Sequence, residues 1–270
     1  MDLRPFKGKV FAVTGGASGI GGAACTLFGT RGARVAVIDM DRKRIRQKIK
    51  DLSSKGIDCR GYICDVSRER ECFAVMKKII MDFGGIDILF NNAGITQRSA
   101  FADTGLPVYR KIMDVDFFGT VNCTKAAIPS LMKNRGMIIV TSSIAGFAPI
   151  IGRSGYSAAK HALHGFYGVL RSELKESGVH VMLVCPGFTR TNLQDRALDG
   201  DGSITKHPQS KTGKESTPDA VARAIYHAAR KKKKMIVLTP VGKISYYLNR
   251  FAPGLFDMIQ ARQLRSELER

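Results

Sequence analysis

Tyr156 and Lys160 lie four residues apart in the run Tyr-Ser-Ala-Ala-Lys, and Ser143 precedes Tyr156 by thirteen residues. On a helix, residues at the first of these spacings share a face, so the lysine ammonium would lie near the phenol. Its positive charge favours the phenolate, and Tyr156 could then act as the general acid and base that interconverts an alcohol and a ketone. Ser143 could donate a hydrogen bond to the substrate oxygen, where charge develops during the reaction.

A glycine-rich loop near the N-terminus predicts a site for a dinucleotide. The apolar run 10–13 predicts a buried strand, and the sequence Thr-Gly-Gly-Ala-Ser-Gly-Ile-Gly follows from Thr14 to Gly21, at the start of a helical pattern. Glycines let the backbone turn tightly and let a pyrophosphate approach the N–H groups of the helix N-terminus. A second apolar run, 35–38, ends at Asp39 and completes the strand, loop, helix, strand and acid that such a site requires.

Together these motifs resemble the short-chain dehydrogenase/reductase family, and the match extends over nearly all of residues 7–240. Three further motifs follow in the family order: Asp65-Val66, Asn91-Asn92-Ala93-Gly94, and Pro186-Gly187 followed by Thr189. In the family the first contacts the adenine, the second supports the central strand and lines the cofactor channel, and the third approaches the nicotinamide carboxamide. The resemblance implies an oxidoreductase with an α/β, Rossmann-type, doubly wound parallel sheet in a single domain.

The resemblance also assigns roles to individual residues. It implies that Ser143, Tyr156 and Lys160 are catalytic. It implies a cofactor site made of Gly15, Ser18, Gly19, Ile20, Gly21, Asp39, Asp65, Val66, Asn92, Ala93, Gly94, Tyr156, Lys160, Pro186, Gly187 and Thr189.

One position departs from the family pattern. The family commonly has an asparagine in the helix before the strand that carries the serine, where it is thought to position a proton-relay water. This chain has Asp116 there. An ionised aspartate has the shape of asparagine but only accepts hydrogen bonds. We therefore expect Asp116 to occupy the relay position, with a relay that is connected differently or tuned to another pH, and with activity retained.

Asp39 favours NAD over NADP. A carboxylate at the end of the second strand accepts hydrogen bonds from the adenosine ribose and repels a 2′-phosphate. NADP-preferring relatives usually have a basic residue in the glycine loop or after the strand, whereas this chain has Ser18 in the loop and Met40 after Asp39. Arg42 and Arg44 are close enough in the sequence to leave NADP as the weaker alternative.

The composition agrees with one large α/β core. The chain has 270 residues, 44% of them hydrophobic, and short apolar runs alternate with helical patterns, as in a parallel sheet covered on both faces. Residues 1–240 are expected to form the catalytic domain.

Six scattered cysteines suggest free thiols in a reducing cytosol. His161 and His164 have a spacing that two metal ligands could use, but no third ligand is near and no metal is expected.

Two apolar or irregular segments point to the substrate. Residues 192–218 have little periodicity and predict a lid that follows the Pro-Gly turn. The loop between Ser143 and Tyr156 contains Phe147, Pro149, Ile150 and Ile151, which could form an apolar wall of the pocket. Together with the apolar tail, this wall favours a hydrophobic secondary alcohol or ketone, such as a steroid, a retinoid or a lipid-derived chain.

Residues 241–270 predict a C-terminal amphipathic helical extension. Its apolar stripe consists of Ile244, Tyr247, Leu248, Phe251 and Leu255, with Lys243 and Arg250 beside it. Such a segment could lie on an anionic membrane, cover the substrate cleft or pack on a second subunit.

The net charge of +20 is concentrated in residues 31–50 and 206–270. Because aromatic residues are not interleaved with the basic ones, a nucleic-acid partner is not expected.

The sequence therefore predicts an oxidoreductase that transfers a hydride between NAD(H) and a small hydrophobic substrate. Alternatives are a 3-oxoacyl-thioester reductase, a non-catalytic dinucleotide-binding scaffold, and a nucleic-acid binder that uses the same fold. The resemblance implies a homodimer or homotetramer. No run approaches the ~18 apolar residues of a membrane span and the N-terminus does not resemble a signal peptide, so we expect a cytoplasmic protein that could contact membranes peripherally.

Overall fold

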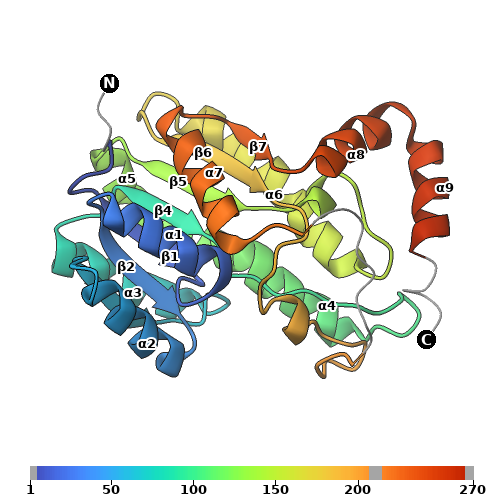
Figure 1. Ribbon diagram of the computed structural model, residues 1–270, viewed down its shortest axis with the longest axis horizontal. Coiled ribbons are helices and arrows are strands. Elements are labelled where there is room, and N and C mark those ends of the chain that lie inside the picture. Colours follow the sequence, from blue (N-terminus) through green and yellow to red (C-terminus); the bar gives the residue numbers. More distant parts are fainter. Residues whose placement is uncertain (1–4, 207–214, 265–270) are drawn as a thin grey trace.

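A parallel sheet forms the centre of the molecule. The computed structural model describes residues 5–206 and 215–264, and within them seven parallel strands pair in the order β3-β2-β1-β4-β5-β6-β7 (Figure 1). The strands are β1 (Val10–Thr14), β2 (Arg34–Asp39), β3 (Cys59–Ile63), β4 (Ile88–Asn91), β5 (Met137–Thr141), β6 (His180–Cys185) and β7 (Met235–Val237). The order reverses between β1 and β4, which opens a crevice at the carboxyl ends of these strands.

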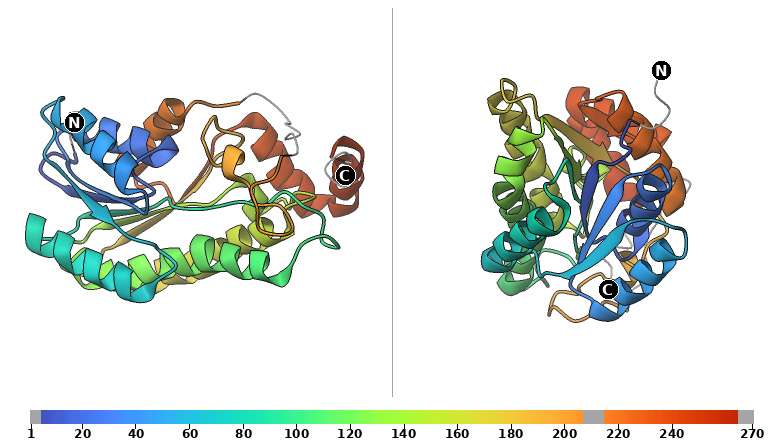
Figure 2. Two further views of the ribbon diagram at one scale, coloured as in Figure 1. Left: turned by 90° about the horizontal axis from the view of Figure 1, so that it is seen from below. Right: turned by 90° about the vertical axis from the view of Figure 1, so that its left-hand side faces the viewer.

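Helices cover both faces of the sheet, and the predicted doubly wound fold is confirmed (Figure 2). One face packs against α1 (Gly19–Thr30), α2 (Arg42–Ser53) and α7 (Pro218–Arg230). The other packs against α3 (Glu69–Phe83), α5 (Gly119–Lys133) and α6 (Ser154–Glu173). Phe11 of β1 stacks on Phe28 of α1 with ring centroids 4.1 Å apart. Because both faces are covered, β1 is apolar up to its last residue, Thr14, and is buried along its whole length.

The edge strand β3 was not predicted from the sequence. Its residues, Cys-Arg-Gly-Tyr-Ile, contain no apolar run, and Arg60, Gly61 and Ile63 are exposed. An edge strand with only one buried side chain, Tyr62, lacks the hydrophobic signal that marks the central strands. Pairing with β2 along its whole length holds β3 in the sheet.

A π-helical turn interrupts the helix that precedes β5. Helix α4 (Leu106–Met113) passes into the π turn η1 (Asp114–Phe118) and then into α5. The N–H of Gly119 donates to the carbonyl oxygen of Asp114, five residues earlier. Such turns insert one extra residue into a helix and are frequent at functional sites. Asp116 lies in the middle of this turn and is fully buried.

The segment expected to be a lid is tied to the loop after β4. Leu198 donates its N–H to Thr96 O at 2.8 Å and accepts from the Arg98 N–H at 2.8 Å, and Gly105 N–H donates to Gly200 O at 2.9 Å. A short 3₁₀ turn, η3 (Gln194–Arg196), precedes these contacts. Residues 207–214 of the predicted lid lie outside the described residues.

The C-terminal extension forms two helices, α8 (Pro240–Phe251) and α9 (Pro253–Gln263), at one end of the molecule, where α9 stands away from the sheet (Figure 1). One side of α8 packs on the 3₁₀ turn η2 (Ile144–Gly146) and on Phe147, whose ring lies 5.1 Å from that of Tyr246. Most of the predicted apolar stripe faces outward instead, and Ile244 and Phe251 are 64% and 75% exposed. Among the described residues, no helix has the length and apolar character needed to cross a membrane.

Candidate active site

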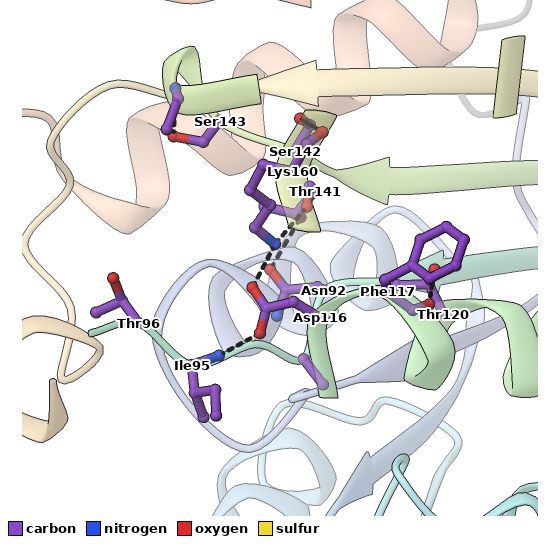
Figure 3. Close-up of polar contacts among 12 residues, drawn as sticks. Asn92, Ile95, Thr96, Asp116, Phe117, Thr120, Thr141, Ser142, Ser143 and Lys160 are labelled. Atoms are coloured by element: carbon purple, nitrogen blue, oxygen red, sulfur yellow. Dashed lines mark hydrogen bonds and ion pairs between the residues drawn. The ribbon is translucent and has the colours of Figure 1, made fainter. Parts of the chain in front are cut away.

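Lys160 is held in the interior by two oxygen atoms. Its Nζ lies 2.9 Å from Asp116 Oδ2 in an ion pair, and it donates a hydrogen bond of 3.1 Å to the backbone oxygen of Thr141 at the end of β5 (Figure 3). The side chains of Lys160 and Asp116 are 5% and 0% exposed. Asp116 Oδ1 accepts a hydrogen bond of 2.7 Å from the N–H of Ile95. Both oxygens of the carboxylate therefore face donors, as expected for an ionised group.

Burial and the neighbouring charges shift the pKa values of Asp116 and Lys160 in opposite directions. Burial raises the pKa of the Asp116 carboxyl, although the charge of Lys160 and the N–H of Ile95 oppose the change. Burial alone would lower the pKa of Lys160, but the charges of Asp116 and Tyr156 outweigh it, so the pKa of Lys160 is raised. Lys160 is thus a stable buried cation, and Asp116 is its nearest counter-charge.

Tyr156 lies one helical turn before Lys160 on α6, on the same side of that helix. The Lys160 Nζ is 5.4 Å from the centre of the Tyr156 ring, and both residues line a cavity at the carboxyl ends of the strands. Tyr156 is 9% exposed. The four-residue spacing thus brings a cation and a phenol together on one wall of the cavity, as predicted.

Ser143 follows β5 and begins η2. Its Oγ accepts a hydrogen bond of 3.1 Å from the N–H of Ala145. The hydroxyl hydrogen is left to donate to another group. In Figure 3 Ser143 lies apart from the Asp116–Lys160 pair, and it is not among the residues that line the cavity. The neighbouring Ser142 points elsewhere: its Oγ lies 2.9 Å from His164 Nε2.

A cavity of about 660 Å³ opens at the carboxyl ends of the strands. It brings together most of the predicted residues, namely Gly15, Ser18, Gly19, Ile20, Asp39, Asp65, Val66, Asn92, Ala93, Gly94, Asp116, Tyr156 and Lys160. The predicted residues that do not line it are Gly21, Ser143, Pro186, Gly187 and Thr189. Of these, Pro186 and Gly187 adjoin η2, where Pro186 O accepts from the Ile144 N–H. Thr189 Oγ1 donates to Gly187 O.

The glycine loop fits a dinucleotide phosphate. Gly15 has a φ of +61°, and a Cβ there would lie 3.0 Å from the Cα of Ala93. A Cβ at Gly21 would collide with the backbone oxygen of Gly15. Ser18 makes no side-chain cap, and the first turn of α1 carries no acidic residue. The N–H groups at the start of α1 are therefore available to an anion.

Asp39 lies beside this loop. Its Oδ2 accepts from the N–H of Ala17 at 3.2 Å, and its Oδ1 accepts from the N–H of Asp41 at 3.1 Å. Arg44 also lines the cavity, but it is engaged by Asp41, whose Oδ2 lies 3.2 Å from Arg44 Nε. The carboxylate of Asp39 is therefore fixed by two backbone N–H groups at the edge of the glycine loop, and Asp39 lines the cavity.

Asn92 connects the ends of three strands. Its backbone N–H donates to Thr14 Oγ1 at 2.9 Å, and its side-chain Nδ2 donates to Thr14 O at 3.2 Å. Thr141 Oγ1 donates to Asn92 Oδ1 at 3.2 Å. The adjacent Asn91 is buried and donates to Thr124 Oγ1, so it supports the core. Asp65 follows the end of β3. Its Oδ1 accepts hydrogen bonds from the backbone N–H and from the hydroxyl of Ser67.

Sequence reasoning missed one wall of the cavity. Helix α4, the start of η1, the residue before the lid and the lid itself contribute the lining residues Pro107, Arg110, Lys111, Asp114, Thr191, Leu193 and Arg196. A Cβ at Gly19 would lie 3.2 Å from Thr191 Cγ2, so the residue just before the predicted lid lies close to the glycine loop. No local signal marks these residues, because their role depends on contacts between segments far apart in the sequence.

Comparisons with known proteins identify the family of the chain. The family profile described as "short chain dehydrogenase" matches residues 9–201. The chain is 35% identical over 267 residues to dehydrogenase/reductase SDR family member 7B of Mus musculus, covering 97% of this chain and 83% of that protein. It is 34% identical over 263 residues to dehydrogenase/reductase SDR family protein 7-like of Drosophila melanogaster, covering 95% and 80%.

Solved structures share the fold. A short chain dehydrogenase/reductase from Burkholderia phymatum in complex with NAD superposes with a TM-score of 0.83 at 22% identity, over 93% of this chain and 95% of that one. The apo form of LigD from Sphingobium sp. strain SYK-6 gives a TM-score of 0.76 at 22% identity, over 93% and 97%. With the family profile and the sequence relatives, these likenesses lead to one conclusion: the chain belongs to the short-chain dehydrogenase/reductase family of oxidoreductases.

Proposed function

We propose that the protein interconverts a hydrophobic secondary alcohol and the corresponding ketone with NAD(H). The observation that carries the proposal is the wall formed by Tyr156 and Lys160, where a buried cation lies 5.4 Å from a phenol ring that faces the cavity. A phenol held beside a cation can both give and take a proton at a substrate oxygen.

Each catalytic residue has its own role in the proposed reaction. When bound, the nicotinamide supplies or accepts the hydride. Tyr156 donates the proton to the ketone oxygen, or removes it from the alcohol. Lys160 stabilises the phenolate that this transfer leaves. Ser143, whose Oγ already accepts from the Ala145 N–H, uses its free hydrogen to donate to the substrate oxygen.

NAD is proposed as the preferred cofactor because of Asp39. Its carboxylate is fixed by two backbone N–H groups and lines the cavity. A 2′-phosphate at this edge would face a negative charge, whereas ribose hydroxyls would find an acceptor. The engagement of Arg44 by Asp41 also leaves this arginine less available to a phosphate.

A hydrophobic substrate is proposed from the surroundings of η2. Phe147 and Ile150 are partly buried in the loop that follows Ser143, and α8 packs on this loop through Tyr246. Leu193 and Leu198 of the lid segment also line the cavity. A steroid-, retinoid- or lipid-like substrate would bury its apolar surface here. A 3-oxoacyl thioester is the alternative substrate, and a non-catalytic scaffold is the alternative outside enzymes.

We also propose two kinds of contact for the whole molecule. Apolar side chains on the helices beside the site, Phe118 in η1 and Val169 in α6, are exposed and would be covered in a homodimer or homotetramer. On α8 and α9, exposed apolar residues lie among Lys243, Arg250 and Arg262, which would suit the surface of an anionic membrane.

The decisive experiment is a screen of hydrophobic secondary alcohols and ketones with both cofactors, following the absorbance of the reduced nicotinamide. For the best substrate, Tyr156→Phe should lower kcat by at least ~10²-fold while NAD still binds. Tyr247→Phe, at an exposed position on α8, is the matched control and should keep its turnover. Near-normal turnover by Tyr156→Phe would refute the mechanism, and no turnover with any substrate would favour the scaffold.

A further inference from the structure

Two faces of helix α4 have different partners. On one face, Val108 and Ile112 form a buried cluster with Ala159 of α6, the residue just before Lys160. Another face lines the cavity, and its residues recur at helical spacing through the start of η1: Pro107, Arg110, Lys111, Asp114 and Val115. Packing on the catalytic helix therefore holds two cations of α4 at the cavity that Lys160 also lines.

The lid brings a third cation to the same cavity. Arg196 ends the 3₁₀ turn η3 and lines the cavity. The N–H of Gly105, the residue before α4, donates to Gly200 O at 2.9 Å, and an isolated β-bridge joins Gln97 to Leu198. These backbone contacts hold the lid against the start of α4 (Figure 1).

Contacts inside the protein do not account for these cations. Within residues 5–206 and 215–264, no ion pair engages Arg110, Lys111 or Arg196. Cations near the end of a helix often stabilise its free carbonyl groups. Here α4 continues into η1, and the Asp114 N–H already donates to the carbonyl oxygens of Arg110 and Lys111.

The phosphates of a dinucleotide have another place in the site. The pyrophosphate suits the N–H groups at the start of α1, and Asp39 disfavours a 2′-phosphate. Of the carboxylates that α4, η1 and the lid contribute to the cavity, Asp116 is paired with Lys160 and only Asp114 remains. Three cations facing one carboxylate give this wall a net positive charge, which attracts an anion other than those of NAD.

We propose that Arg110, Lys111 and Arg196 bind an anionic group, a carboxylate or a phosphate, on an amphiphilic substrate whose reacting carbon lies at Tyr156. This inference rests on the proposed function and specifies its substrate class. The anionic group lies at the end of the substrate remote from the carbonyl or hydroxyl.

The lining of the cavity suits such an amphiphile. Leu193 and Leu198 of the lid line it beside the three cations and would contact an apolar chain. All three cations are exposed, so the anionic end of the substrate keeps contact with water. Its binding therefore avoids the cost of burying a charge.

The test compares a long-chain oxo fatty acid with its methyl ester, which has the same chain and carbonyl group but no charge. With NADH, wild type should prefer the acid, as measured by the ratio of the two kcat/KM values, and added salt should lower this preference. Because each exposed cation contributes little alone, Arg110→Gln with Lys111→Gln should lower the preference roughly tenfold, and Arg196→Gln roughly threefold. Lys231→Gln with Lys233→Gln removes two exposed charges just before β7, at the opposite edge of the sheet, and should keep the wild-type preference.

Equal kcat/KM for the acid and the ester in wild type would overturn the inference, as would an unchanged preference in the variants of α4 and the lid. Affinity for NAD is measured by calorimetry without a ketone. If these variants lose affinity for NAD and keep the preference for the acid, the cations serve the cofactor and the inference is wrong.

A binding measurement covers the case in which the variants do not fold or no ketone is turned over. Wild type with NAD bound should bind an alkyl phosphate at least ~10-fold more tightly than the alcohol of the same chain length. Equal binding of the two would overturn the inference. Because this measurement needs no turnover, an inactive protein that binds the alkyl phosphate selectively would refute the proposed function and leave the anion site standing.

Discussion

Asn249 on α8 donates a hydrogen bond of 2.7 Å from Nδ2 to the backbone oxygen of Phe147, in the loop that follows Ser143. Residues 102 positions apart are thus joined where the C-terminal extension meets the candidate site. The ring of Tyr246, one turn before on the same helix, packs against the Phe147 ring. The extension is therefore in a position to fix the loop that would border a bulky substrate.

Asn249→Ala should loosen this loop. A hydrogen bond of this kind contributes about 0.5–1.5 kcal/mol, so we expect KM for a bulky ketone to rise roughly two- to tenfold, with a smaller change for a small ketone. Arg250→Ala, the exposed neighbour, is the control. The measurement is KM for the two substrates in the three proteins. Equal effects of Asn249→Ala on both substrates would contradict a role of the loop in substrate size.

Asp39→Ala should change the choice of cofactor. Charge-assisted hydrogen bonds contribute about 1.5–3 kcal/mol, which corresponds to roughly ten- to a hundredfold in affinity. Loss of the carboxylate should therefore weaken NAD and relieve the repulsion of NADP, and Arg42 or Arg44 could then hold the 2′-phosphate. The measurement is kcat/KM for both cofactors in wild type and variant. A wild type that already prefers NADP would mean that the basic residues after β2 control selectivity.

The outward face of α8 and α9 can be tested with vesicles. If it lies on anionic lipid, wild type should sediment with phosphatidylserine-containing liposomes at low salt, and Ile244→Glu with Phe251→Glu should abolish the interaction. Deletion of residues 241–270 should do the same. Ser245→Glu, at a less exposed position of α8, adds the same kind of charge as a control. A wild type that never sediments would assign this face to the cleft or to a subunit contact.

Acid should destabilise the fold in part through His164. Burial lowers the pKa of its imidazole from 6.5 to about 4. The unfolded chain therefore binds a proton between these pH values that the folded protein does not, so the contribution of His164 is complete above pH 6.5 and is lost as the pH falls towards 4. The full loss is roughly 3 kcal/mol.

The variant that tests this is His164→Asn. Its free energy of unfolding, measured with urea at several pH values between 7 and 4, should fall less steeply than that of wild type. His227→Asn, which removes an exposed histidine on α7, should follow the wild-type slope. Parallel curves for wild type and His164→Asn would show that the histidine does not contribute to acid sensitivity.

Much of the architecture was predictable because it is encoded locally. The apolar runs at 10–13 and 35–38 became the central strands β1 and β2, since strands buried on both faces must be apolar. The glycines between β1 and α1 are required by backbone geometry, as the φ of +61° at Gly15 illustrates. The pairing of Tyr156 with Lys160 needed only the period of a helix.

Other features were beyond the sequence because they depend on contacts made through space. The strand β3 has no apolar run and is held by its pairing with β2. The outward orientation of Ile244 and Phe251 depends on which side of α8 meets η2. Arg110 and residues of the lid form one wall of the cavity because an isolated β-bridge joins the loop after β4 to the lid, about 100 positions later in the sequence.

Asp116 combines both kinds of information. The sequence by itself determined that an acidic residue replaces the usual asparagine, that a lysine follows Tyr156 at helical spacing, and that a glycine loop precedes an acid. Only the tertiary structure decided that Asp116, in a π turn, reaches Lys160, 44 residues later on another helix, at 2.9 Å. The physical reason is that burial removes water from both charges, so their interaction depends on a distance that packing alone sets.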